Sequence, residues 1–146
     1  MHLITATEKN IEQLTQLFDG YRMFYKQPSN LKAAREFLLD RFQKKDSVVF
    51  MVMDKDGGAL GFTQLYPLFS SVSMQRTYVL NDLFVSELAR GRGVGAALME
   101  HAKKFARATG SKGLTLETSV DNPAQKLYHR MGWVKDTEVN HYTWEI

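Results

Sequence analysis

Apolar residues in the first third of the chain recur with a helical period. After a short initial strand, a helix is predicted whose inward face carries Ile11, Leu14, Leu17, Phe18 and Tyr21. The break at Gln27-Pro28-Ser29 ends this helix, and Ser29 is a suitable N-cap for a second one. The inward face of the second helix would carry Leu31, Ala34, Phe37, Leu38 and Phe42.

Strand-like runs separated by turns occupy the middle of the chain. Residues 48–53 are continuously apolar, and residues 54–58 (Asp-Lys-Asp-Gly-Gly) form a turn signal before a second run at 60–69. Another turn at 70–73 precedes a third run at 78–85. Because the connections are short, these strands should pair as antiparallel hairpins.

The remaining pattern mixes helices and strands. A long amphipathic helix is predicted over 93–108, followed by a strand at 114–118 and a short helix at 123–131. Trp133 would start a final pair of strands that continues through Trp144. One strand–helix–strand unit thus lies within an otherwise antiparallel sheet, which predicts a mixed α/β fold built as one domain over residues 1–146.

Composition removes several classes of function. The chain of 146 residues has no cysteine, which excludes disulfides, thiolate metal sites and a catalytic thiol. The histidines lack metal-ligand spacing, so no metal is expected. There is no leader-like start and no apolar run long enough for a membrane, so we expect a cytoplasmic protein without membrane association. The net charge of +3 comes from scattered residues, which argues against a nucleic-acid partner.

The most informative segment is Arg90-Gly91-Arg92-Gly93-Val94-Gly95, which joins the third strand to the long helix. Glycines allow the backbone N–H groups to turn inward, and the first turn of a helix adds unpaired N–H groups and a positive dipole end. Two guanidiniums reinforce this arrangement. Residues 90–96 therefore predict a site for a phosphate or pyrophosphate.

Other glycine-rich loops fit less well. Gly91-x-Gly93-x-x-Ala96 formally matches the dinucleotide fingerprint, with Glu117 as a ribose-binding acid. That fingerprint normally opens a doubly wound parallel sheet, whereas this segment follows hairpin-linked strands. A Walker loop is disfavoured because no Gly-Lys-Ser/Thr follows.

Two motifs resemble those of the GNAT superfamily of N-acetyltransferases. Arg90-x-x-Gly93-x-Gly95 resembles the family's acyl-CoA loop, Arg/Gln-x-x-Gly-x-Gly/Ala. The segment Asp121-Asn-Pro-Ala-Gln-Lys-Leu-Tyr-His-Arg-Met-Gly-Trp133 resembles Asn-x-x-Ala-x-x-Leu-Tyr-x-x-x-Gly-Phe. The resemblance extends over residues 3–146 and is nearest to the small histone/polyamine-acetyltransferase branch. It implies an acetyl-CoA-dependent transferase that moves an acetyl group to an amine by direct attack in a ternary complex.

The resemblance also implies how acetyl-CoA would be held. Backbone groups next to a bulge in the third strand would pair with pantetheine, and the Val85 N–H would face the thioester oxygen. The implied contacts are Leu83, Phe84, Val85, Arg90, Gly91, Arg92, Gly93, Val94, Gly95, Ala96, Asn122 and Tyr128. The sequence departs from the family at one point: Asp121 stands where the family has its asparagine, and Asn122 follows it.

The catalytic residues are assigned by chemistry and by the motif. Tyr128 matches the family tyrosine that gives a proton to the departing sulfur, although its spacing alone also fits core packing. An alkylammonium must lose a proton before it attacks, and Asp82 is the first candidate base, with Glu117 second. A solvated or structurally paired carboxylate is an equally good interpretation of Asp82. Related polyamine enzymes carry an acidic pair in this strand, whereas this chain has Asn81 at the first of the two positions.

The acceptor is expected to be a primary amine: a polyamine, a small-molecule amine or a lysine side chain. Tyr21, Tyr25, Tyr78 and Glu117 are the predicted acceptor-binding residues, since aromatic rings suit an alkyl chain or a cation. The alternative is a non-catalytic acyl-CoA-binding regulatory domain. A homodimer is expected because His141-Tyr-Thr-Trp-Glu-Ile146 reads as an apolar edge strand that needs cover.

Overall fold

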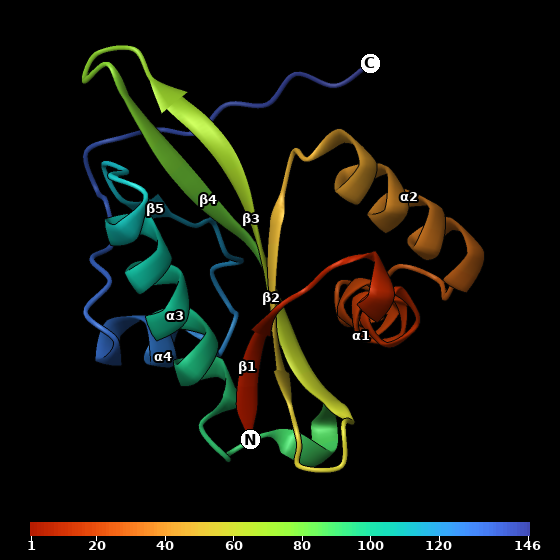
Figure 1. Cartoon of the computed structure of the whole chain (residues 1–146). Coiled ribbons are helices and arrows are strands. Elements are labelled where there is room, and N and C mark those ends of the chain that lie inside the picture. The colour runs from red at the N-terminus through yellow and green to blue at the C-terminus, as the bar shows by residue number, and fades with distance from the viewer.

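The computed structural model describes residues 1–146 and contains one five-stranded sheet (Figure 1). Its strands are β1 (His2–Thr5), β2 (Val48–Met53), β3 (Ala59–Ser70), β4 (Gln75–Val85) and β5 (Leu114–Thr115). They lie side by side in sequence order, with β1 to β4 antiparallel and β4 parallel to β5. The predicted mixed α/β sheet with one parallel pair is confirmed.

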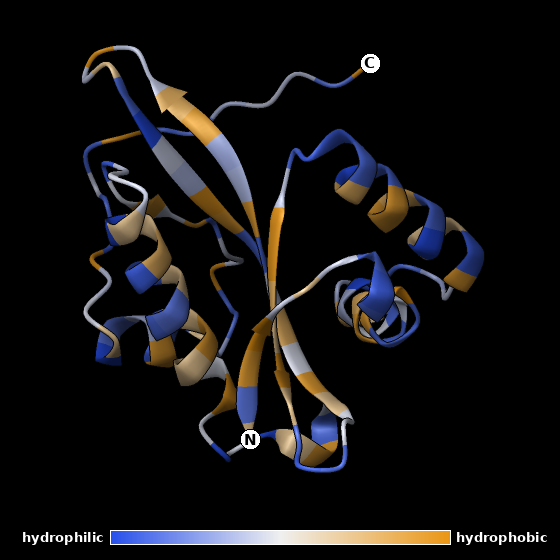
Figure 2. Ribbon diagram, in the orientation of Figure 1, coloured by the Kyte–Doolittle hydropathy of each residue, from blue (hydrophilic) through white to orange (hydrophobic).

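Helices cover both faces of the sheet. α1 (Ile11–Phe24) and α2 (Leu31–Lys44) pack on one face, while α3 (Val94–Ala108) and the short α4 (Gln125–Arg130) pack on the other (Figure 1). Each face has its own buried apolar cluster, and the strands between them are mostly apolar (Figure 2). No helix combines the length and the apolar character needed to cross a membrane.

An extra residue in β4 changes which face its side chains reach. Gln64 of β3 lies opposite Asp82, and the next β3 residue lies opposite Leu80, so Asn81 has no partner and forms a β-bulge. Leu80, before the bulge, packs in the cluster under α3. Phe84, after it, packs against the cluster under α1 and α2. Because alternate residues share a face, an unbulged strand would place Leu80, Asp82 and Phe84 together; the bulge turns the last two towards α1.

β4 and β5 separate soon after they pair. Only Tyr78 and Val79 of β4 are paired with β5, at Leu114 and Thr115. The strand predicted over 114–118 is therefore too long. Beyond Val79, β4 has no strand beside it on this edge, so a gap opens there.

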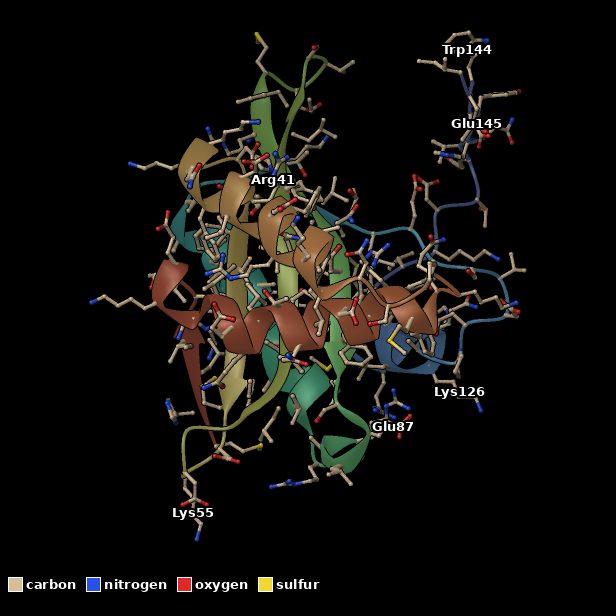
Figure 3. All side chains as sticks on the ribbon, turned by 90° about the vertical axis from the view of Figure 1, so that its right-hand side faces the viewer. Arg41, Lys55, Glu87, Lys126, Trp144 and Glu145 are labelled. Atoms are coloured by element: carbon tan, nitrogen blue, oxygen red, sulfur yellow. The ribbon has the colours of Figure 1, made fainter.

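The prediction of a final pair of strands through Trp144 is wrong. The chain contains no strand after β5, and every residue from Val134 to Ile146 is exposed. Figures 1 and 3 show this segment leaving the body, with Trp144 far from the helices and the sheet. Alternating apolar residues give a segment the capacity to be a strand, but a strand forms only where another backbone pairs with it, and here none does.

The start of α2 also differs from the prediction. Asn30 is its N-cap, because the Asn30 side chain accepts a hydrogen bond of 3.1 Å from the Ala33 N–H. The hydroxyl of Ser29 instead donates to the Asp19 carboxylate at 2.6 Å, which ties the connection to α1. Phe37, predicted to point inward, is 41% exposed, although its ring stacks on Phe18.

Candidate active site

The free edge of β4 presents backbone hydrogen-bonding groups to the gap. The Ser86 N–H donates to the Leu60 carbonyl at 2.9 Å, so at position 86 the backbone faces β3. Since these directions alternate along a strand, the N–H and C=O groups of Val85 and Leu83 face the gap, and those of Phe84 face β3. Two of the three residues predicted to pair with pantetheine thus direct their main chain into the gap.

A loop of left-handed glycines follows β4. A short 3-10 turn, η2 (Glu87–Ala89), leads into Gly91 and Gly93, whose φ values are 73° and 79°. Gly93 precedes α3 directly, no side chain caps that helix, and its first turn holds no acidic residue. The N–H groups at the start of α3, from Val94 onward, therefore have no partner within the helix and are available to an anion.

Arg90 ties this loop to the end of β4. Its Nε donates to the Val85 carbonyl at 3.2 Å, and its guanidinium carbon lies 6.0 Å from the centre of the Phe84 ring. Arg92, two residues further on, is exposed. The loop therefore joins the uncapped helix end, the free edge of β4 and two positive charges in one region.

Two glycines allow the elements around the loop to approach closely. A Cβ on Gly61 of β3 would lie 2.7 Å from the Phe84 carbonyl oxygen and 3.0 Å from Val94 Cγ1. A Cβ on Gly95 would lie 3.2 Å from Leu127 Cδ2 of α4. The absence of a side chain at these positions lets β3, the end of β4 and the start of α3 pack tightly against each other.

Asp82 is a buried carboxylate on the face turned towards α1. It is 1% exposed, and it accepts hydrogen bonds from Gln64 Nε2 at 2.6 Å and from Asn81 Nδ2 at 2.8 Å. Burial raises the pKa of Asp82, while its hydrogen bonds to Asn81, Gln64 and Tyr21 oppose the rise. A carboxyl in this environment binds a proton more readily than a carboxyl in water.

Tyrosines surround Asp82. The Tyr21 hydroxyl donates to the Asn81 carbonyl at 3.2 Å, and the Tyr21 and Tyr25 rings lie 5.1 Å apart in an edge-to-face contact. Burial and the neighbouring Asp82 charge raise the pKa of both Tyr21 and Tyr66. These phenols therefore stay neutral at physiological pH. The structure thus brings Tyr21 and Tyr25, two predicted acceptor residues, to the predicted base.

Tyr128 and Asn122 lie beside the gap, on α4 and on the loop before it. Tyr25, which caps the C-terminal end of α1, lies close enough to both residues to hydrogen-bond with Asn122 and to affect the charge of the Tyr128 phenol. The Asn122 amide donates to Thr118 Oγ1 at 2.9 Å and accepts from the Ala124 N–H at 2.9 Å, so it fixes the turn that leads into α4. Burial, together with the nearby Tyr25 phenol, raises the pKa of Tyr128. The Tyr128 phenol is therefore neutral at physiological pH.

Two predicted acceptor residues lie elsewhere. Tyr78 is 3% exposed and packs in the core under α3, with its ring 5.2 Å from Phe105. Glu117 is exposed and forms an ion pair of 3.2 Å with His141. The bulge explains the position of Tyr78. Without it, the even-numbered residues of β4 would all share one face, but the extra residue at Asn81 puts Tyr78 on the face opposite to Asp82.

Sequence reasoning did not identify Gln64 as a partner of Asp82. The signal was a lone amide within the apolar run of β3, and an amide in a buried strand requires a hydrogen-bonding partner.

The sequence pattern also did not reveal a groove of about 760 Å³ along α1. That groove is lined in part by Gln13, Gln16, Gly20, Phe24, Phe84 and Arg90.

Comparison with known proteins identifies the family. The sequence profile of the acetyltransferase (GNAT) family matches residues 11–133. The chain belongs to the GNAT acetyltransferase family. It is 43% identical to the uncharacterized N-acetyltransferase YhfO of Bacillus subtilis, over 97% of this chain and 95% of that protein. It is 37% identical to a streptothricin acetyltransferase of Streptomyces lavendulae, over 60% of this chain and 45% of that protein.

A solved structure of the GNAT type agrees with these sequence relationships. A crystal structure described as a "probable acetyltransferase" superposes with a TM-score of 0.94 at 40% identity, covering 100% of this chain and 98% of the other. The predicted GNAT fold and the prediction of an enzyme are confirmed. The chain is an acetyltransferase of this family.

Proposed function

We propose that this GNAT protein transfers an acetyl group from acetyl-CoA to a primary amine, by direct attack while both substrates are bound. The observation that carries the proposal is a single strand edge, on β4, with the glycine loop at its end and Asp82 just after its bulge. An anion site and a buried base are thus joined by a stretch of free backbone. Family members generally use acetyl-CoA, and the residues present fit it.

Acetyl-CoA would supply the activated acetyl group, and the loop would supply positive charge and N–H donors for its negatively charged pyrophosphate. The N–H groups of residues 91–96 and the guanidiniums of Arg90 and Arg92 would hold the phosphates. The gap-facing main chain of Leu83 and Val85 would pair with pantetheine. The Val85 N–H is a fixed donor in the same gap, which suits it to stabilise negative charge that develops on a thioester oxygen.

Tyr128 would donate a proton to the departing thiolate. A phenol with a raised pKa is fully protonated at neutral pH, so it is ready to act as an acid without a preceding proton uptake. Its place beside the gap, on α4, is compatible with contact to a thiol group lying there. Asn122 would keep the turn before α4 fixed and so help to position Tyr128.

Asp82 would take the proton from the ammonium form of the acceptor. An alkylammonium has a pKa near about 10, so a base is required at neutral pH, and a raised carboxyl pKa reduces the difference to be overcome. The hydroxyl of Tyr21 lies next to Asp82 and could pass the proton on. The ammonium nitrogen would lose one proton to an Asp82 carboxylate oxygen before attack. The second proton, which the nitrogen loses when the amide forms, would replace the one that Tyr128 gives to the departing thiolate, so that one proton in total passes from Asp82 to solvent.

The acceptor class follows from the surroundings of Asp82. A single buried carboxylate among phenol rings favours one cationic amine on an alkyl chain, through charge and cation–π contact. The relationship to a streptothricin acetyltransferase supports a small-molecule amine over a protein lysine. We therefore place small alkyl amines and polyamines first.

The test combines binding with turnover. Calorimetric titration with acetyl-CoA should show one site, and thiol release should be measured against a panel of small amines, polyamines and lysine peptides. The Asp82→Asn variant should bind acetyl-CoA as the unchanged protein does but lose most of its turnover at neutral pH. The Glu117→Gln variant is the matched control, because Glu117 is exposed and paired with His141. The role of Asp82 would be contradicted if both variants lost turnover equally, or if neither lost any.

The regulatory alternative makes a different prediction. A domain that only senses acyl-CoA would bind it but release no thiol with any amine. The buried, hydrogen-bonded Asp82 favours the enzyme, because a sensor would have no need to hold a costly buried carboxyl beside the gap.

A further inference from the structure

Arg90 holds a backbone carbonyl that faces the gap beside β4. The N–H of Ser86 donates to the Leu60 carbonyl of β3, so the carbonyl of Val85, in the same planar peptide group, points the opposite way, into the gap. Arg90 Nε donates a hydrogen bond of 3.2 Å to that carbonyl. The Arg90 side chain therefore reaches one of the two positions whose main chain is proposed to pair with pantetheine.

The guanidinium of Arg90 is held there only weakly. Its carbon lies 6.0 Å from the centre of the Phe84 ring, at the outer limit of a cation–π contact, and no carboxylate forms an ion pair with it. Arg90 is exposed and lines part of the groove of about 760 Å³ along α1, so space for movement adjoins it. A phosphate would attract this positive charge more strongly than its present partners do.

Arg90 and an incoming pantetheine chain compete for the same acceptor. A carbonyl oxygen has two lone pairs, but the guanidinium approaches that of Val85 from the gap, where the pantetheine chain would lie. An amide N–H of pantetheine would put a neutral donor in place of a charged one, so the exchange at Val85 alone is unfavourable. The exchange becomes favourable when the released guanidinium binds a phosphate, because opposite charges then meet through two parallel hydrogen bonds.

We propose that Arg90 selects the acyl donor: its side chain leaves the Val85 carbonyl when the donor brings a phosphate that holds the guanidinium. The inference rests on the proposed function, since it takes an acyl-CoA as the donor, and it adds the residue that disfavours thioesters of the same chain without phosphates. The discrimination equals the difference between what the guanidinium gains from a phosphate and what it loses at Val85 and Phe84. Arg90 thus couples the edge of β4 to the glycine loop.

A fixed brace is the other role that this geometry allows. If Arg90 stayed on Val85 in every complex, it would hold the loop against the end of β4, and its removal would weaken all donors alike. Exchange predicts effects of opposite sign. Removing Arg90 helps a donor without phosphates, because no contact has to be broken, and harms a donor with phosphates, because one partner is lost. The sign of the first effect separates the two roles.

The first experiment measures the binding of two donors by calorimetric titration. S-acetyl-pantetheine carries no phosphate, and acetyl-dephospho-CoA adds the pyrophosphate without the ribose phosphate. Arg90→Ala should bind acetyl-pantetheine about two- to tenfold more tightly than the unchanged protein, and acetyl-dephospho-CoA about tenfold more weakly. Arg92→Ala is the matched control, because it removes the same charge from the same loop, where the bond to Val85 belongs to Arg90. It should weaken the second donor and leave the first unchanged.

The two donors also separate failure of this inference from failure of the proposed function. If acetyl-dephospho-CoA binds the unchanged protein, but Arg90→Ala weakens both donors or leaves acetyl-pantetheine unaffected, the exchange is overturned while the acyl-CoA site stands. If neither donor binds the unchanged protein, the acyl-CoA site is wrong and the exchange falls with it. Both substituted residues are exposed, so each variant should keep the circular dichroism spectrum of the unchanged protein.

The second experiment follows Arg90 itself. The nitrogen–proton magnetic resonance signal of its Nε is identified as the one that Arg90→Ala lacks, and it is recorded while acetyl-dephospho-CoA is added. The signal should shift as the donor saturates the protein, because the Nε–H group leaves the Val85 carbonyl for a phosphate. The same shift is expected in Arg92→Ala. A signal that saturating donor leaves unmoved would show that Arg90 remains on Val85, which overturns the proposal.

Discussion

Gln64 donates a hydrogen bond of 2.6 Å to the Asp82 carboxylate at a place where Gln64 is 0% and Asp82 1% exposed. The bond opposes the effect of burial, because a donor stabilises the charged form that burial disfavours. The pKa of Asp82 is nevertheless raised overall. Gln64 therefore limits how far the pKa rises, and it fixes the direction of the carboxylate oxygens.

Replacing Gln64 with leucine should move the acid limb of the pH–rate profile to higher pH. With that donor removed, burial acts with less opposition, so Asp82 holds its proton to a higher pH and fewer molecules carry the base form. The measurement is kcat/KM against pH for a good amine. Gln64→Glu should shift the limb further in the same direction, because it places a second carboxyl beside Asp82. An unmoved limb in both variants would show that Asp82 does not set it.

Asp82→Asn should stabilise the fold at neutral pH. A carboxyl whose pKa is raised on folding contributes stability below its ordinary pKa of about 4, and loses that contribution as the pH rises through the raised value. An amide does not titrate, and Gln64 can rotate to present its unpaired Oε1 to it. Urea unfolding should therefore favour the variant at pH 8, with a smaller or reversed difference at acid pH. A variant that is equally less stable at both pH values would contradict this account.

The fold was largely predictable, because each buried strand and helix carries its own pattern. The run Val48–Met53 and the helical face that includes Leu14 each specify one element with one buried side, and the structure forms both. The glycine loop was equally predictable, since Gly91 and Gly93 have the left-handed backbone that only glycine adopts easily.

What the sequence could not supply was pairing between distant segments. The bulge at Asn81 depends on the register between β3 and β4, and it decides that Asp82 meets Tyr21 while Tyr78 does not. The prediction of strands at the end of the chain was wrong for a related reason. The alternation around Trp144 indicates that a strand could form, but it does not indicate whether another backbone lies beside it to pair with.

Tyr128→Phe should slow turnover without weakening acetyl-CoA binding. Removing the hydroxyl removes the proton donor and little else, since the ring still packs near Trp133. A general acid contributes about 10²-fold or more, so kcat should fall by at least about that factor. Steady-state thiol release and a binding titration of the same sample provide both numbers. Tyr142→Phe serves as the matched control, because Tyr142 is a tyrosine 86% exposed near the end of the chain, and its kcat should change far less. A rate for Tyr128→Phe within about twofold of the unchanged enzyme would remove Tyr128 from the mechanism.

Adding one methyl group at Gly61 should be much more damaging than adding it at Gly20, although both glycines contact Phe84. At Gly61 the new Cβ would lie 2.7 Å from the Phe84 carbonyl oxygen, which can move only if the β3–β4 pairing opens. At Gly20, within α1, it would lie 3.0 Å from the end of the Phe84 ring, which can turn aside, and alanine is favoured over glycine in a helix by about 1 kcal/mol. We expect Gly61→Ala to lower the free energy of unfolding by about 1–3 kcal/mol and to weaken acetyl-CoA binding. Gly20→Ala should remain near the unchanged protein in both. Urea unfolding measures the free energy of unfolding, and calorimetric titration measures acetyl-CoA binding. A similar loss in both variants would mean that contact with the Phe84 ring, rather than with its backbone, decides whether an added methyl group is accepted at this end of β4.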